Sequence, residues 1–274
     1  MLFRSSILII ISFVFYPMIK ALITSFESGM GNNLKFVGTA NYTRLFTDDI
    51  FKKAVTNTLI YLVVQVPIMI LLALFISVML NDKNLKLKGF FRTAIFLPCV
   101  TSLVAYSVIF KSLFSNDGLM NNLLMNIHLI TTPIEWITSP FWAKITIIIA
   151  ITWRWTGYNM IFYLAGLQNI DPSIYEAARI DGATGVKQFF HITVPLLKPI
   201  ILFTTVMSTT GTLQLFDEVM NITKGGPGNA STTISQYIYN LSFKYSPNFG
   251  YAAAVSFTIV IMIAVLSLIQ FKVA

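Results

Sequence analysis

Long apolar runs separated by short polar segments are the feature that most limits what this chain can fold into. A bilayer core of about 30 Å is crossed by about 20 helical residues, because a helix rises about 1.5 Å per residue and satisfies its own backbone groups. The sequence therefore predicts an all-α, polytopic membrane protein with six transmembrane helices. The expected spans are residues 6–23, 59–80, 93–110, 143–165, 200–220 and 251–269.

The composition fits lipid as the solvent. Hydrophobic residues make up 55% of the chain and charged residues 11%, whereas an ordinary soluble domain has about 25% charged residues. The 19 basic residues are spread along the chain, which argues against nucleic-acid binding. Cys99 is the single cysteine, so no internal disulfide can form. His128 and His191 lack ligand-spaced partners, and we expect no metal and no cofactor in this chain.

Orientation is predicted from the connections between spans. Six spans put both termini on one side of the membrane, and basic residues are balanced between the two sides. The short connection at residues 81–92 contains four basic residues, and short basic loops stay in the cytoplasm. We therefore expect cytoplasmic termini. We interpret the apolar start of the chain as an uncleaved span, because no small-residue cleavage site precedes a soluble domain.

The connection between the fourth and fifth spans, residues 171–195, has a distinct pattern. Asp171 before Pro172 is typical of a helix start, since the carboxylate caps the helix and proline presets the first φ angle. Gly182 stands where this helix should end, and residues 186–193 predict a second short helix. The segment is thus expected to form a helix-turn-helix elbow at the membrane surface.

This elbow resembles the signature loop of the permeases of binding-protein-dependent ABC importers. That loop reads Glu-Ala-Ala, three residues, Gly, nine residues, then Ile-x-Leu-Pro. The chain has Glu176-Ala177-Ala178, Gly182 and Ile192-Thr193-Val194-Pro195 at the same spacing, with valine in place of leucine. The resemblance implies a type I importer permease fold with residues 1–274 as one transmembrane domain. It also implies that the loop is cytoplasmic and couples to an ATPase subunit through Glu176, Ala177, Ala178, Asp181 and Gly182.

Further fragments resemble the carbohydrate branch of this family, near the larger maltose-permease subunit and the glycerol-phosphate permeases. They are Phe36-Val37-Gly38, Asn41-Tyr42, Asn57-Thr58, Phe91-Arg92, Leu97-Pro98, Ala165-Gly166-Leu167-Gln168, Phe216-Asp217-Glu218, residues 223–228, Thr232-Thr233, Tyr237-Ile238-Tyr239 and Phe249-Gly250-Tyr251. The resemblance implies a heterodimer with a second related permease, two copies of an ABC ATPase, and an extracytoplasmic solute-binding protein. The expected location is the bacterial cell membrane.

The chain is not expected to be an enzyme. It contains no Gly-x4-Gly-Lys-Ser/Thr string, so ATP and magnesium should bind to the partner ATPase. Costly polar groups within spans usually face a cavity, and aromatic faces with amides and hydroxyls suit a sugar. Tyr158 and Ser208 match sugar-contacting positions of the maltose permease. Chemistry and depth add Trp155, Asn159, Thr212 and Gln214 to the predicted substrate pathway.

The cargo and the energy source leave alternatives open. Ile151 and Leu215 replace amides that contact sugar in the maltose permease, so the sugar is not specified. A glycerol 3-phosphate or small-polyol importer of the same family is one alternative. An ion-coupled secondary transporter is another, although such proteins usually show internal repeats and carboxylates at mid-depth. A membrane enzyme would need a convergent acid, base or nucleophile set within a span, and the sequence shows none.

Overall fold

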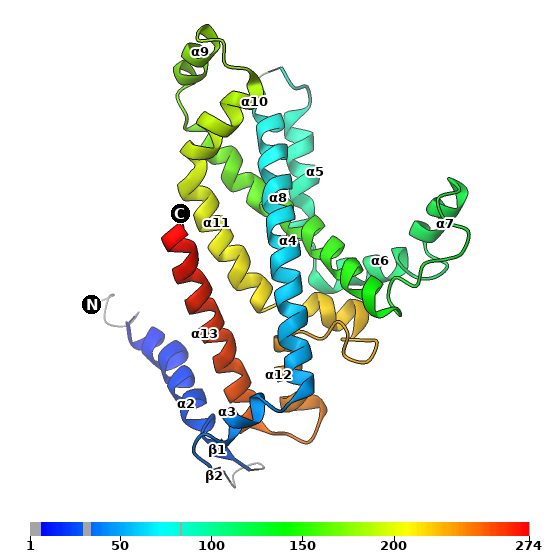
Figure 1. The fold of residues 1–274 in the computed structure, drawn as a ribbon, viewed down its shortest axis with the longest axis vertical. Helices are drawn as coiled ribbons and strands as arrows, with labels where there is room; N and C mark the ends of the chain where they lie inside the picture. Colours follow the sequence, from blue (N-terminus) through cyan, green and yellow to red (C-terminus); the bar gives the residue numbers. More distant parts are fainter. Residues whose placement is uncertain (1–6, 30–33, 83, 274) are drawn as a thin grey trace.

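The computed structural model describes residues 7–29, 34–82 and 84–273, so Ser6 of the first predicted span and Lys83 lie outside the described residues. The described chain is mostly helical (Figure 1). Its elements are η1 (Ile11–Phe15), α2 (Tyr16–Thr24), β1 (Glu27–Ser28), β2 (Lys35–Phe36), α3 (Ala40–Leu45), α4 (Asp49–Asn81), α5 (Lys88–Val100), α6 (Leu103–Leu113), α7 (Leu119–Asn126), α8 (Pro140–Gln168), α9 (Pro172–Ile180), α10 (Gly185–Gln188), η2 (Phe189–Thr193), α11 (Val194–Leu213), η3 (Val219–Thr223), α12 (Ile234–Tyr239), η4 (Asn240–Lys244) and α13 (Phe249–Val273).

Not all six predicted spans are long, straight and apolar. Four described helical segments are long and apolar enough to cross a membrane, namely Ile7–Thr24, α4, Gly185–Leu213 and α13, and the pair α5 and α6 makes a fifth if taken together. α8 has 29 residues but is not among them, because polar side chains such as Arg154 and Asn159 interrupt its apolar sequence.

The third predicted span, residues 93–110, is not one straight helix. α5 and α6 are bent by 100° at a break between them, where Thr101 and Ser102 have extended backbone. Pro98 in the last turn of α5 weakens the helix there. Arg154 of α8 then donates from Nη2 to the Cys99 carbonyl at 3.3 Å and from Nη1 to the Thr101 carbonyl at 3.2 Å. The freed carbonyls are therefore satisfied by a neighbouring helix.

Two further span boundaries differ from the prediction. α4 begins at Asp49, well before residue 59, because the Asp48 carboxylate caps it by accepting from the backbone N–H groups of Ile50 and Phe51 at 2.9 and 3.0 Å. α11 ends at Leu213 rather than near residue 220. The chain leaves the helix there, and the Leu215 carbonyl accepts a bond from Thr233 Oγ1 at 2.6 Å.

A small β-hairpin is absent from the all-α prediction. β1 and β2 pair antiparallel, and the hairpin is held from two sides. Asn41 Nδ2 donates to the carbonyls of Ser25 and Glu27 at 2.9 Å each. Gly250 of α13 lies so close that a Cβ there would be 1.8 Å from the Glu27 carbonyl oxygen. The hairpin is thereby fixed against the start of α13.

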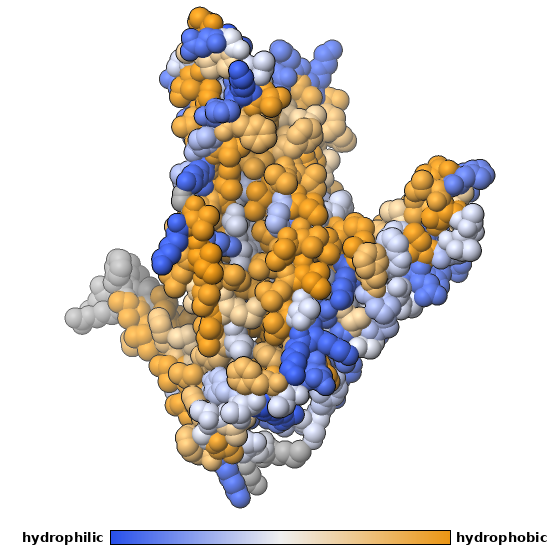
Figure 2. Space-filling view, in the orientation of Figure 1, coloured by the Kyte–Doolittle hydropathy of each residue, from blue (hydrophilic) through white to orange (hydrophobic). Residues whose placement is uncertain are grey.

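The central packing unit is formed by α4, α8 and α11. Buried side chains of all three meet in one cluster that includes Ala73, Leu74, Tyr163, Leu164 and Leu197. α13 packs on α11, α2 lies beside α13, and α6 and α7 extend to the side (Figure 1). Apolar side chains cover much of the outer surface along the helices (Figure 2), as expected where lipid or another membrane subunit replaces water.

Candidate functional site

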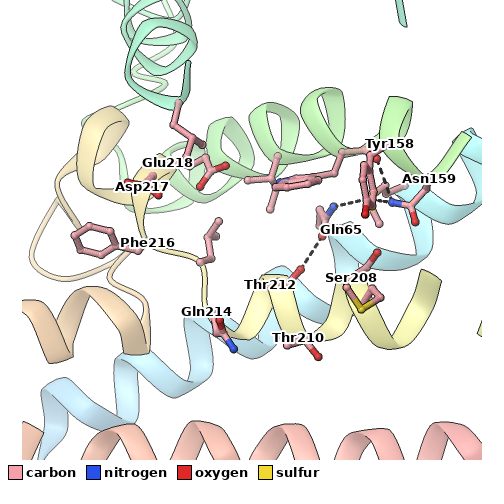
Figure 3. A pocket seen from close by; sticks show the side chains of 17 residues that line it. Gln65, Tyr158, Asn159, Ser208, Thr210, Thr212, Gln214, Phe216, Asp217 and Glu218 are labelled. Carbon is pink, nitrogen blue, oxygen red and sulfur yellow. Dashed lines mark hydrogen bonds between the residues drawn. The ribbon is translucent and has the colours of Figure 1, made fainter. Parts of the chain in front are cut away.

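A cavity of about 400 Å³ lies between α4, α8, α11 and the segment that follows α11 (Figure 3). All six predicted pathway residues line it. Trp155, Tyr158 and Asn159 come from α8, Ser208 and Thr212 come from α11, and Gln214 is the C-cap of α11. The remaining lining residues are Gln65, Met69, Leu103, Ile151, Met207, Thr210, Gly211, Leu215, Phe216, Asp217 and Glu218. The structure thus brings the predicted pathway residues together in one place.

One wall of the cavity is aromatic. The rings of Trp155 and Tyr158 meet edge to face with centroids 5.7 Å apart, and Tyr158 meets Phe162 at 5.1 Å. Phe162 packs in turn against Phe203 of α11. Such rings are held in place by their neighbours and offer a rigid flat surface to a ring-shaped solute.

A second part of the cavity wall is polar. Thr212 Oγ1 donates to Gln65 Oε1 at 3.2 Å, and Asn159 Nδ2 donates to the Trp155 carbonyl at 3.1 Å. Sequence reasoning missed Gln65, although an amide in the middle of the predicted span 59–80 was a usable signal. Ile151 and Leu215, the apolar residues at expected amide positions, also line the cavity.

Two carboxylates, Asp217 and Glu218, lie at the end of the cavity beside α6 (Figure 3). Glu218 is 4% exposed. Arg154 does not pair with either carboxylate within ion-pair distance; its guanidinium caps the break between α5 and α6 and lies over the Tyr106 ring at 4.8 Å. This end of the cavity is therefore lined by two acidic side chains without a basic partner within ion-pair distance among the described residues.

The elbow between α8 and α11 consists of α9, a turn at residues 181–184, α10 and η2. Asp171 Oδ1 accepts from the Ser173 N–H at 2.9 Å, and this hydrogen bond lowers the pKa of the Asp171 carboxyl. Gly182 has a φ of +78°, a left-handed conformation that favours glycine and ends α9. These two local features agree with the prediction from sequence.

The predicted coupling residues are presented on the surface of this elbow. Glu176, Ala177, Asp181 and Gly182 are exposed, and Ala178 is half-buried. The elbow is held as a unit because Tyr175 of α9 shares a 2.9 Å hydrogen bond with Thr193 and because Gln188 Nε2 donates to the Ala183 carbonyl at 2.9 Å. In Figure 1, α9 and α10 form one end of the molecule, and the β-hairpin lies at the other end.

The chemistry of the cavity suits binding rather than covalent catalysis. Amides, hydroxyls and aromatic rings inside an apolar bundle match a neutral polyhydroxylated solute. Among residues 7–29, 34–82 and 84–273, no three His, Cys, Asp or Glu side chains gather where they could hold a metal ion.

Comparison with known proteins identifies relatives along nearly the whole chain. Residues 53–273 match the family described as the inner membrane component of binding-protein-dependent transport systems. The lactose transport system permease protein of Rhizobium radiobacter is 59% identical over 271 residues, covering 98% of this chain and 91% of that protein. The arabinooligosaccharides transport system permease protein of Bacillus subtilis strain 168 is 36% identical, covering 95% and 83%.

The fold also has solved counterparts. A crystal structure of a bacterial ABC transporter involved in the import of the acidic polysaccharide alginate contains a chain with a TM-score of 0.87 and 24% identity, covering 99% of this chain and 93% of that one. The fold is therefore that of an ABC importer permease, and the sequence matches establish the family. The chain belongs to the family of inner membrane permease components of binding-protein-dependent transport systems.

Proposed function

We propose that this chain is a permease subunit of an ATP-driven, binding-protein-dependent importer for a sugar or oligosaccharide in the bacterial cell membrane. The observation that carries the proposal is the cavity enclosed by α4, α8 and α11, with an aromatic wall and a polar wall inside an apolar bundle. The permeases named for lactose and arabinooligosaccharides are similar over the same length. Lactose is therefore the first sugar to test.

The elbow couples the cavity to a separate ATPase in this proposal. Ile174, Ile180, Val186 and Phe190 on or beside α9 and α10 are 41%, 87%, 69% and 62% exposed. Large apolar side chains around an exposed Glu176 and the small Ala177 support docking of this surface into a groove of a partner. Two copies of an ABC ATPase bind ATP and magnesium, one under this chain and one under a second, related permease. This chain itself hydrolyses nothing.

The orientation follows from the same assignment. We place the elbow, the connection between α4 and α5, and both termini on the cytoplasmic side, in line with the basic residues at 81–92. In Figure 1 the α4–α5 connection lies at the same end as α9 and α10. The β-hairpin and α12 then face the outside, where a solute-binding protein delivers its cargo. ATP-driven closure of the ATPase pair moves the elbow and switches the access of the cavity.

The alternative cargoes and mechanism are less well supported. Glycerol 3-phosphate would bring an anion towards Asp217 and Glu218, which line the cavity. A small neutral polyol would leave much of the aromatic wall unused. An ion-coupled secondary transporter does not agree with the family membership of the chain.

The test is the ATPase activity of the complete assembly in proteoliposomes, with the second permease, the ATPase and the binding protein. Lactose, an arabinooligosaccharide and glycerol 3-phosphate are compared as stimulants. Glu176→Lys reverses the charge of the coupling surface and should abolish stimulation. Glu135→Lys reverses an exposed charge in the connection before α8 and should leave stimulation intact. Equal ATP turnover in both variants would contradict the coupling role of the elbow.

A further inference from the structure

Two side-chain amides from different helices meet at one thioether inside the cavity. Gln65 Nε2 of α4 donates to Met69 Sδ at 3.2 Å, and Asn159 Nδ2 of α8 donates to the same sulfur at 3.4 Å. The three side chains are 2%, 1% and 2% exposed, in the order Gln65, Met69 and Asn159. Figure 3 shows the amides of Gln65 and Asn159 pointing towards one another at the cavity wall.

A thioether is a weak hydrogen-bond acceptor. An amide N–H buried against such a partner keeps much of its unmet hydrogen-bonding capacity. Gln65 Oε1 accepts only from Thr212 Oγ1, at 3.2 Å, among the described residues, and a carbonyl oxygen can accept a second bond. The polar wall therefore has two amide N–H donors, on Gln65 and Asn159, that are paired only with a weak sulfur acceptor. It also has one acceptor site on Gln65 Oε1 that no other described side chain occupies.

A second Gln–Thr pair in the chain shows a different arrangement. Gln270 Nε2 of α13 donates to Thr209 Oγ1 of α11 at 2.7 Å, and neither residue lines the cavity. That amide has a good oxygen acceptor and joins two helices. Gln65 instead directs its N–H to sulfur at the cavity surface, although Thr212 lies within hydrogen-bond distance of its carbonyl oxygen.

We propose that Gln65 and Asn159 together read a pair of neighbouring sugar hydroxyls, and that the Met69 sulfur accepts their hydrogen bonds only while the cavity is empty. Both donors reach a single atom, so they are close enough to serve two adjacent hydroxyl groups of one ring. The entering hydroxyl oxygens replace the sulfur as acceptors, and one hydroxyl donates to Gln65 Oε1. This inference rests on the proposed function and makes Gln65 a specificity-determining residue.

The experiment measures the initial rate of radiolabelled lactose uptake by the complete assembly in proteoliposomes, at low concentrations of lactose-loaded binding protein. Gln65→Met removes the amide but keeps an unbranched side chain of similar length, and should lower this rate about threefold to tenfold, the loss of one neutral hydrogen bond. Gln270→Met removes the matched amide outside the cavity and should change the rate less than about twofold. ATPase activity at saturating loaded binding protein should stay near the wild-type value in both variants.

Met69→Leu gives a change of opposite sign. It conserves volume but removes the competing acceptor, so lactose uptake at low loaded binding protein should rise by roughly twofold or more. Uptake of Gln65→Met equal to that of the wild type, or a loss in Met69→Leu as large as that in Gln65→Met, would overturn the inference and leave the importer function standing. A wild-type assembly that takes up no lactose, arabinooligosaccharide or glycerol 3-phosphate would overturn the proposed function and this inference with it.

Discussion

At Gly157, α8 lies so close to the backbone of α5 that replacement by alanine should destabilise the protein. A Cβ at Gly157 would lie 2.1 Å from the Ile95 carbonyl oxygen, 2.9 Å from the Ile95 carbonyl carbon and 3.0 Å from the Phe96 Cα. All three are backbone atoms, so no side chain can rotate away. Ordinary contact begins at 3.4 Å, and α5 must therefore move away from α8 by about 1.3 Å.

This movement disturbs the bonds that hold the break between α5 and α6. The bonds from Arg154 to the carbonyls of Cys99 and Thr101, at 3.3 and 3.2 Å, are already long and should be lost. Overpacking costs about 1–3 kcal/mol, and one lost bond to a charged donor costs about 1.5–3 kcal/mol. The expected destabilisation by Gly157→Ala is thus about 3 kcal/mol or more, or about 6 °C or more in Tm by the scaling of a domain of this size.

The assay heats the fluorescently tagged chain in detergent and measures the fraction that remains monodisperse by size-exclusion chromatography. Gly89→Ala is the matched control, because it lies on α5 and a Cβ there meets nothing within 4 Å. It should leave Tm unchanged or raise it slightly, since alanine favours a helix over glycine by about 1 kcal/mol. A Gly157→Ala protein that melts within a degree of the wild type would refute the close contact.

Two other predictions concern the end of the molecule opposite the elbow. Asn57 Nδ2 donates to the carbonyls of Asn229 and Thr232 at 3.1 and 3.0 Å. Asn57→Leu removes both bonds and should destabilise the fold by about 2–4 kcal/mol. It should also speed proteolysis at residues 225–230, and unchanged proteolysis would contradict this prediction. Burial raises the pKa of Asp48, but hydrogen bonds from Tyr237, Tyr251 and the backbone outweigh it and lower the pKa below its usual value. The stabilising contribution of Asp48 is therefore present above about pH 4 and is lost as the pH falls through the lower, folded-state pKa. Tm should fall more steeply on acidification in the wild type than in Asp48→Asn, and parallel pH profiles would show that Asp48 is not the titrating group.

Local signals in the sequence were enough to predict the elbow. The cap at Asp171 and the left-handed conformation of Gly182 depend only on neighbours within a few residues. The sequence shows both, as Asp before Pro at a helix start and Gly at a helix end. The six pathway residues were also predictable, because polar and aromatic groups at one depth of two apolar helices have few places to go except a cavity. Their function as a sugar pathway stays a prediction.

The break between α5 and α6 could not be predicted in the same way. Pro67 lies inside α4, and that helix continues unbroken to Asn81, whereas Pro98 is followed by a bend of 100°. The difference comes from tertiary contacts. The Arg154 guanidinium, 55 residues away in the sequence, donates to the Cys99 carbonyl that the end of α5 leaves without a helical partner. Gln65 was missed for a related reason, since its neighbours come from other helices: Thr212 of α11 donates to its amide oxygen, and Asn159 of α8 donates to the same Met69 sulfur as Gln65.

Several short fragments that resembled the sugar-permease branch turn out to meet in space. Asn57 and Thr58 bind the segment around Thr232, because Asn57 donates to its carbonyl and Thr58 Oγ1 accepts from the Ile234 N–H at 3.2 Å. Gly225 has no room for a side chain, since a Cβ would lie 2.5 Å from both Gln236 Oε1 and Thr232 Oγ1. These fragments form one hydrogen-bonded joint between α4 and the loop after η3.

Lactose uptake into proteoliposomes that contain the complete assembly and the external binding protein tests whether this chain serves an ATP-driven sugar importer. ATP inside the vesicles is compared with a proton gradient and with a sodium gradient in the absence of ATP. We predict uptake that requires ATP, the binding protein and an intact Glu176, with no uptake driven by either gradient. Uptake driven by an ion gradient without ATP, and unaffected by Glu176→Lys, would contradict it.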